Sequence, residues 1–358
     1  MRLIVHTDLL HTSCFPYEQD AWIELLQQVA VKNYNAEVLL LQKNRIINCL
    51  DKQVVHIPVS KPMQQPLVWQ LFYAVRLRLL LGKLKPNIFL SLSATHLLVN
   101  SVAQWIYIPD GTCSAGTIQR YLQQTGRRAR RSNILFLQAE SAPAKAAPLH
   151  TMPPYVPAVF TAVPKETKET VKAAYTGGAE YFLYMGPIHK QANLLNLLRA
   201  FSQFKKWQNS NMKLVLCGDK LWPRKDFERL LGTYKHRHDV VITGAIPIKE
   251  AAQLTASAYA LVHPFAGDGP SVSALAAIQA AVPAIVIRTS ANEAAGGNAF
   301  LYAQQNSTEE LAAKMMLLYK DETLRSQLIR NGKILLAAAV PHPAVKQLTA
   351  LLQASVSK

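Results

Sequence analysis

The loop Ala266–Ser271 (AGDGPS) has the composition of an anion-binding turn. It follows an apolar run that Pro264 stops, and it leads into an almost wholly apolar helix expected over Val272–Ala281. Ser271 or Ser273 can cap the first turn of this helix. The first amides of a helix lack intrahelical acceptors and lie at the positive end of its dipole, so a phosphate-like anion fits such a position. An ordinary strand–helix–strand unit without a ligand has the same pattern, and both interpretations stay open at this point.

Short motifs surround this loop in a fixed order. His263-Pro264 forms the turn before it, Val282–Val286 (VPAIV) begins the next strand, and Asn292–Gly297 (NEAAGG) follows as a second loop. With Asp268-Gly269 in the place of a Glu-Gly pair, the segment 181–333 resembles the C-terminal domain of the family 4-type retaining glycosyltransferases, which have the GT-B fold. Further stretches that match the family pattern are Tyr184–Ile188, Asn193–Phe201, Leu214–Gly218 and Val240–Gly244.

The resemblance implies an α/β fold of the GT-B type, with two doubly wound parallel-sheet (Rossmann-like) domains that face a cleft. We expect residues 1–165 to form the acceptor-side domain and residues 166–340 the nucleotide-sugar-binding domain. Residues 341–358 are expected to form a helix that can cross back to the first domain. The proline-rich stretch Ala142–Lys168 is the expected connection between the domains.

Two charged positions of the family pattern are replaced in this chain. The glutamate that holds the ribose of the donor falls on Ala276, and the Arg-Lys pair that grips the diphosphate falls on Gln191-Ala192.

Two hypotheses about the function follow from these replacements. The first is an active hexosyltransferase that moves a sugar from a nucleotide-sugar donor to a glycan or lipid-linked acceptor in bacterial envelope polysaccharide biosynthesis. The second is a catalytically inactive relative that acts as a binding partner or sensor.

The resemblance also implies a donor site assembled from the residues that remain. Asp268 would contact the sugar hydroxyls as a catalytic residue, Lys190 would reach the diphosphate, and Glu293 stands where the family has its loop glutamate. A solvated loop lysine is the competing interpretation of Lys190. The other expected donor-binding residues are Gly186, His189, Gly269, Pro270, Ser271 and Val272. No cofactor and no metal are expected, because the nucleotide sugar is the substrate and GT-B enzymes of this type work without a metal.

The N-terminal half alternates short apolar runs with amphipathic ones, which is typical of a parallel sheet covered by helices on both faces. Ligands of such sheets bind beyond the carboxyl ends of the strands. This rule indicates His6–Asp8, Ser91–Thr95 and Pro109–Gly111. Asp110 could accept a hydrogen bond from an acceptor hydroxyl or act as its base, and Asp-Gly could equally make a plain turn.

The loop from His6 to Gln19 permits two interpretations. His6, His11, Tyr17 and Glu18 can make polar contacts with an acceptor, or the segment can be a closed surface loop.

Composition and charge narrow the class of protein. The chain has 358 residues, 50% of them hydrophobic and 17% charged, which fits about two packed domains. Four scattered cysteines show no spacing for zinc or disulfides, and the first residues show no signal-peptide pattern, so a cytoplasmic protein is expected.

The formal net charge of +17 indicates an anionic partner. Nucleic acid is not expected, because no nucleic-acid-binding motif accompanies the charge. No run is long and apolar enough to span a bilayer. Basic residues of the N-terminal half could instead bind an anionic membrane surface, or form only a solvated face. These residues are Arg76, Arg78, Lys83, Lys85, Arg127, Arg128, Arg130 and Arg131.

Overall fold

The computed structural model describes residues 2–6, 15–32, 37–42, 54–58, 75, 78–92, 102–108, 132–137, 149–222, 224–267, 269–340 and 342–356. By its contacts the chain divides into two compact units. The first unit holds Met1–Ser13, Ala21–Tyr155 and Pro341–Lys358, and the second holds Cys14–Asp20 and Val156–Val340.

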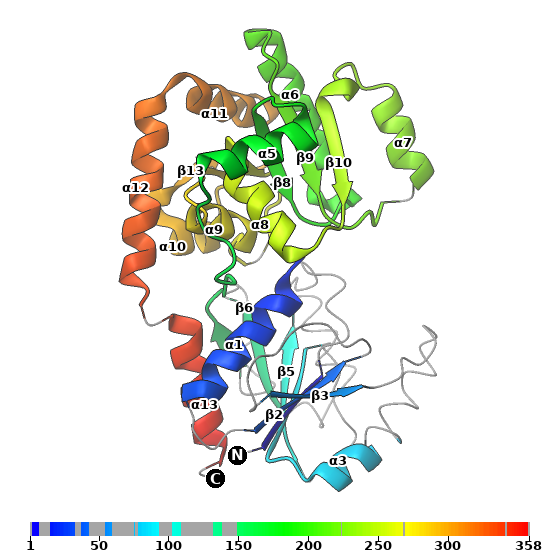
Figure 1. The fold of residues 1–358 in the computed structure, drawn as a ribbon, viewed down its shortest axis with the longest axis vertical. Coiled ribbons are helices and arrows are strands. Elements are labelled where there is room, and N and C mark those ends of the chain that lie inside the picture. The colour runs from blue at the N-terminus through cyan, green and yellow to red at the C-terminus, as the bar shows by residue number, and fades with distance from the viewer. Residues whose placement is uncertain are drawn as a thin grey trace. The chain divides into compact units, whose positions relative to one another are not determined.

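The first unit is built on a seven-stranded parallel sheet (Figure 1). Its strands lie in the order β3 (Val54–Pro58), β2 (Glu37–Gln42), β1 (Arg2–His6), β4 (Ile88–Ser91), β5 (Ala103–Ile108), β6 (Ser132–Leu137) and β7 (Leu149–Met152). The order places β1 beside β4, so the chain builds outward on one side of β1 and then returns to the other side. This is the doubly wound arrangement that the alternating sequence predicts.

Among the described residues, the helices α1 (Glu18–Lys32), α3 (Arg78–Leu84) and α13 (Pro343–Val356) belong mainly to this unit. Apolar residues at helical spacing along α1, Trp22, Leu25, Leu26 and Val29, are buried, and the Trp22 ring lies 4.7 Å from that of Tyr107 on β5. Helix α13 packs on β7, where Gln347 donates to the Thr151 carbonyl. The His342 ring, just before α13, lies 4.7 Å from the ring of Tyr155.

The second unit contains a six-stranded parallel sheet. The strands lie in the order β10 (Val240–Gly244), β9 (Lys213–Cys217), β8 (Tyr181–Met185), β11 (Ala260–His263), β12 (Ala284–Ile287) and β13 (Phe300–Ala303). Residues of β8, β11 and β12 are buried throughout, as expected for a parallel sheet with both faces covered.

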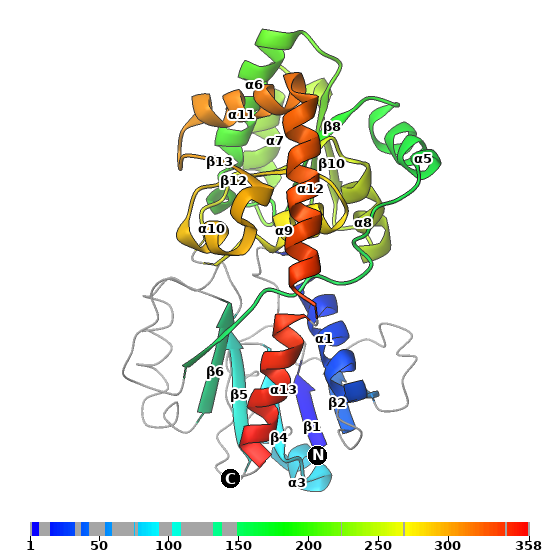
Figure 2. The ribbon, with the colours of Figure 1, turned by 90° about the vertical axis from the view of Figure 1, so that its left-hand side faces the viewer.

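Helices cover both faces of this second sheet (Figures 1 and 2). On one face α6 (Leu194–Gln208) packs against α11 (Thr308–Lys320), and the core there includes Phe182, Phe201 and Phe204. The other face carries α5 (Lys165–Thr176), α8 (Ile248–Ser257) and α9 (Val272–Gln279). Figure 2 shows the long helix α12 (Glu322–Ala338) crossing α9, which it contacts. The remaining helices are α7 (Arg224–Gly232) and α10 (Ser290–Gly296).

Two sequence-based expectations are corrected by these elements. The stretch Ala142–Lys168 is not merely a connection, because it contains β7 and the first turn of α5. Asn292–Gly297 is not a loop, because residues 292–296 complete the helix α10 that Thr289 caps. Alanine, which favours helix, occupies two of these positions.

One stretch, Glu322–Ala354, is long and apolar enough by length and composition to cross a membrane. It consists of α12 with 17 residues and α13 with 14, which are separate helices. A membrane-spanning helix needs about 20 consecutive apolar residues, so neither helix alone reaches that length.

Candidate functional site

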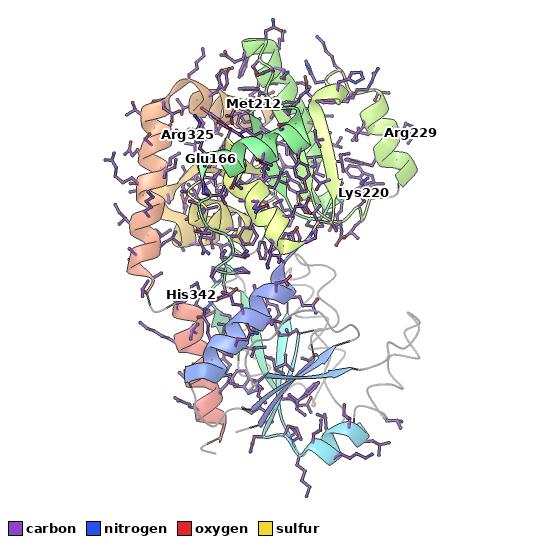
Figure 3. The ribbon with its side chains drawn as sticks, viewed as in Figure 1. Glu166, Met212, Lys220, Arg229, Arg325 and His342 are labelled. Atoms are coloured by element: carbon purple, nitrogen blue, oxygen red, sulfur yellow. The ribbon has the colours of Figure 1, made fainter. Side chains whose placement is uncertain are left out.

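The strand order of the second unit selects one place for a ligand. From β8 the chain proceeds to β9 and β10 on one side, and then returns to add β11, β12 and β13 on the other side. The connections after β8 and β11 therefore diverge, and the crevice between them at the carboxyl ends of the strands is where ligands of such sheets bind. In Figure 3, Lys220 lies beyond this end of β9 and Met212 lies at the opposite end.

The loop after β8 is held tightly against the loop after β9. The Gly186 amide donates to the Cys217 carbonyl at 2.9 Å, and the Ile188 amide donates to the Asp219 carbonyl at 2.8 Å. Gly218 adopts a φ of +146°, and a Cβ there would lie 2.0 Å from the Gly186 oxygen. Only glycine allows this approach, so the backbone around the predicted donor residue Gly186 is fixed in position.

His189 and Lys190 follow in the same loop and already have partners. His189 Nδ1 accepts the amide of Gln191 at 2.9 Å and so caps the short 3₁₀ turn Lys190–Ala192. The Lys190 ammonium is exposed and lies 3.7 Å from the carboxylate of Asp226. An exposed pair at this distance is weak, which leaves Lys190 able to move to an anionic ligand.

The entrance of α9 carries the anion-binding geometry that its sequence indicates. Ser271 Oγ accepts the Ala274 amide at 3.2 Å, and Ser273 Oγ donates to the Met185 carbonyl at the end of β8 at 2.8 Å. The Ser271 amide, which the sequence offered to a ligand, instead donates to Asn292 Oδ1 at 2.8 Å. In the first turn of α9, the amides of Val272 and Ser273 have no intrahelical acceptor.

His263 lies at the carboxyl end of β11 and was not identified as a functional residue from the sequence. It is buried, its ring stacks on Tyr184 at 6.1 Å, and the Phe265 ring meets its edge at 6.2 Å. Within the described part of the chain, its Nδ1 has no hydrogen-bond partner. Burial lowers the pKa of His263 to about 4, so the imidazole is neutral at pH 7. This nitrogen lies at the switch point, the place between β8 and β11 where the connections diverge. A buried neutral nitrogen without a partner there is suited to a ligand hydroxyl.

The residue after β12 is a cation that the sequence analysis also missed. Arg288, directly after β12, pairs with Glu293 and stacks over the Tyr302 ring at 4.9 Å. Glu293, predicted to bind the donor, is therefore a half-exposed partner of Arg288. Arginine beyond a strand end is a signal that sequence reasoning could have used, because Arg288 ends the apolar run AIVI.

Several predicted residues lie outside the described residues. They include both predicted catalytic residues, Asp268 and Asp110, and the basic residues Arg76, Arg127, Arg128, Arg130 and Arg131. The predicted Gly269 and Pro270 are described and buried beside the entrance of α9. Tyr17, predicted to contact an acceptor, is buried in the second unit and donates to the Ile246 carbonyl at 3.0 Å.

Comparison with known proteins shows which family and which fold the chain resembles. Residues 165–334 match the family model for glycosyl transferases group 1. The O-antigen chain mannosyltransferase B of Escherichia coli is 23% identical over 152 residues, which are 42% of this chain and 40% of that protein. The matched part thus spans well under half of the curated relative.

Solved structures resemble the chain over nearly its whole length. WaaG, a glycosyltransferase involved in lipopolysaccharide biosynthesis, superposes with a TM-score of 0.76 at 13% identity, covering 98% of this chain and 99% of WaaG. Sucrose-phosphate synthase of Thermosynechococcus elongatus also gives 0.76, at 12% identity with both chains fully covered. Anabaena Alr3699/HepE, solved in complex with UDP and glucose, gives 0.72 at 12% identity, covering 100% of this chain and 99% of HepE. These likenesses confirm the predicted GT-B fold.

Proposed function

We propose that the chain, which has the GT-B fold and matches the glycosyl transferases group 1 model over residues 165–334, moves a sugar from a nucleotide-sugar donor to a glycan or lipid-linked acceptor. The acceptor belongs to envelope polysaccharide synthesis in this proposal. An O-antigen mannosyltransferase and a lipopolysaccharide glycosyltransferase among the similar proteins support this assignment.

The observation that carries the proposal is a group of neutral hydrogen-bonding groups at the switch point that have no partner among the described residues. The amides of Val272 and Ser273 begin α9, and the buried His263 ends the neighbouring strand. Helix-terminal amides bind phosphate without needing a side-chain charge. This chemistry suits a donor whose charged family contacts at positions 276 and 191–192 are replaced.

Both replaced positions that now hold alanine are buried. Ala276 is fully buried within α9, and Ala192 is 4% exposed. A carboxylate or ammonium at either position would be buried and would need its own partner. In our proposal the diphosphate is therefore held by backbone amides together with Lys190.

The proposed chemistry uses electrostatic stabilisation. As the bond between the sugar and the diphosphate breaks, negative charge grows on the departing oxygen, and the α9 amides and Lys190 stabilise it. Asp268 orients the donor sugar through its hydroxyls, and Asp110 takes the proton of the attacking acceptor hydroxyl. No metal takes part in the proposed reaction.

We place the reaction in the cytoplasm, on the inner face of the membrane where lipid-linked acceptors are made. The net charge of +17 supports attraction to an anionic surface.

A ligand screen tests the proposal. Purified protein is heated with UDP-, GDP-, ADP- and dTDP-sugars and with the free nucleotides, and hits are confirmed by calorimetry. A donor that binds only the folded chain raises the melting temperature with increasing concentration. The shift should disappear in His263→Ala and persist in Lys172→Ala, because Lys172 pairs with Glu180 at the opposite end of the sheet. If no nucleotide shifts the melting temperature at millimolar concentration, the enzyme assignment is wrong and the inactive relative is favoured.

A further inference from the structure

Asn292 is a residue of α10 with an exposed fraction of 2%. Its side chain and its backbone both make hydrogen bonds. Its side-chain Oδ1 accepts the Ser271 amide at 2.8 Å, and its Nδ2 donates to the Ile287 carbonyl at 2.8 Å. Its own amide donates to Thr289 Oγ1 at 3.1 Å, and its carbonyl lies 3.2 Å from the Tyr302 hydroxyl, which is 2.8 Å from the Gly297 carbonyl. One residue thus joins the end of β12, the start of α10, the strand β13 and the residue before α9.

The bond to Ser271 decides which amides at the entrance of α9 remain available. Ser271 is the N-cap residue, and its side chain already accepts the Ala274 amide. With its own amide committed to Asn292, the amides of Val272 and Ser273 in that first turn have no acceptor among the described residues. The orientation of these two amides follows from the orientation of Ser271.

We infer that Asn292 is a positioning residue of the donor site: its side-chain amide holds Ser271 so that the next two amides of α9 point at the donor diphosphate. The inference rests on the proposed function. Asn292 itself does not touch the donor, and its effect is transmitted through the Ser271 backbone.

The chemistry of the site requires a carboxamide. Oδ1 must accept from an N–H while Nδ2 donates to a carbonyl, and only asparagine or glutamine combine both functions in one uncharged group. Alanine would leave the Ser271 amide and the Ile287 carbonyl buried without partners. An ionised aspartate would place a negative charge against the Ile287 carbonyl, whereas a protonated aspartate would reproduce both hydrogen bonds.

The charged groups near position 292 allow this protonation to be tested. Arg288 and Glu293 are paired with each other, and Tyr302 contributes a neutral hydroxyl. The helix α9 has no titratable side chain, and the one carboxylate of the preceding loop is Asp268, which lies outside the described residues. Burial raises the pKa of a carboxyl group at this position, so an aspartate there gains its proton as the pH falls.

The experiment measures the dissociation constants of UDP and GDP by calorimetry for wild type, Asn292→Ala and Asn292→Asp. Asn331→Ala is the matched control, because Asn331 ties α12 to the Asn298 carbonyl at 2.8 Å without reaching Ser271. Asn292→Ala should raise the dissociation constant of the bound nucleotide at least about 10-fold, which corresponds to loss of about one hydrogen bond to a charged group. Asn331→Ala should stay within about twofold of wild type.

Asn292→Asp tests the positioning role through the pH dependence of nucleotide affinity, which a mere loss of stability would not produce. It should bind weakly at about pH 7.5 and recover toward the wild-type constant at about pH 5.5, because the protonated carboxyl restores both hydrogen bonds. Hydrogen exchange at the Ser271 amide, followed by NMR, should be faster in the aspartate variant at the higher pH. This variant also replaces the alanine variant if the latter does not fold.

The outcomes separate the two claims. If wild type binds UDP or GDP and Asn292→Ala binds it equally well, the positioning role is wrong and the proposed function stands. If Asn292→Asp is weak at both pH values, the carboxamide requirement is wrong. If wild type binds no nucleotide, the proposed function fails, and the positioning role fails with it because there is no donor to position.

Discussion

At the amino-terminal end of the six-stranded sheet, Lys205 is buried and lies 3.0 Å from the carboxylate of Asp239. Lys213 reaches the other oxygen of the same carboxylate at 2.8 Å. Lys172 of α5 pairs with Glu180, which directly precedes β8. Each of these three lysines has a carboxylate partner, and Lys205 and Lys213 share theirs.

The carboxyl-terminal end of the same sheet is different. Its buried polar side chains are neutral ones, among them His263, Ser271, Ser273 and Asn292. Two of its charged side chains, Lys190 and Arg288, are 65% and 49% exposed. At this end, His263 Nδ1 and the amides of Val272 and Ser273 lack partners among the described residues.

The difference indicates that the amino-terminal end of the sheet contributes mainly to stability, whereas the carboxyl-terminal end is suited to ligand binding. Buried charge is tolerated only when it is paired, and such pairs leave nothing for a ligand. Neutral groups can remain uncommitted at a smaller free-energy cost, and they gain hydrogen bonds only when a ligand arrives. The contrast predicts that substitutions at the two ends change different measurable properties.

The largest loss of stability is expected from substitution of Gly218, and Gly178 at the opposite end of the sheet serves as its comparison. Gly218→Ala would place a Cβ 2.0 Å from the Gly186 oxygen, a backbone clash that cannot relax cheaply. We expect a loss of about 4 kcal/mol or more of unfolding free energy, together with loss of nucleotide binding. Gly178→Ala, at a φ of +85° with no atom within 4 Å, should cost only about 1–2 kcal/mol. Urea unfolding measures both, and equal losses would contradict the close approach of the two loops.

The second prediction concerns the pH dependence of stability. Burial lowers the pKa of His263 to about 4, below its unfolded value of about 6.5. Between these values the unfolded chain binds the proton and the folded chain does not, so stability falls as the pH drops from about 6.5 to about 4. The loss should approach about 3 kcal/mol. His263→Gln should flatten this part of the profile in urea unfolding, and an unchanged slope would show that the ring is not buried neutral.

The amino-terminal end should respond in a different pH window. Burial opposes ionisation of Asp239, but hydrogen bonds from Lys213 and Lys205 and their charges lower its pKa below the ordinary value. Its contribution to stability is therefore present above the unfolded pKa of about 3.9 and is lost as the pH falls through the lower folded value. Asp239→Asn should thus alter the profile at more acidic pH than His263→Gln does.

Much of the fold was predictable because buried parallel strands have a simple signature. The strands Tyr181–Met185, Lys213–Cys217 and Ala284–Ile287 are each a short, largely apolar run beside turn residues, which is the pattern that predicts a buried strand. The strand β7 was missed because LHTM lies among prolines that suggest a linker, and it is recognisable only by its pairing with β6.

The site was less predictable because its decisive contacts join residues that are distant in sequence. His263 is functional in our proposal through its burial against Tyr184, a partner from another strand. The bond from Ser271 to Asn292 spans 21 residues and depends on α10 being a helix, where the sequence indicated a loop. Local pattern identified the entrance of α9 but could not show which of its amides are free.

The smallest change in stability is expected from Lys190→Ala. The Lys190–Asp226 pair is exposed and 3.7 Å long, so its loss should change the unfolding free energy by less than about 0.5 kcal/mol. Nucleotide affinity should nevertheless fall about 10-fold, because a charged hydrogen bond to the diphosphate is removed. Lys172→Ala should do the reverse, lowering stability by up to about 1 kcal/mol through loss of the Glu180 pair without changing affinity. Calorimetry and urea unfolding of both variants test this. Should Lys190→Ala bind nucleotide as wild type does, Lys190 is only a solvated lysine, and the α9 amides alone hold the donor.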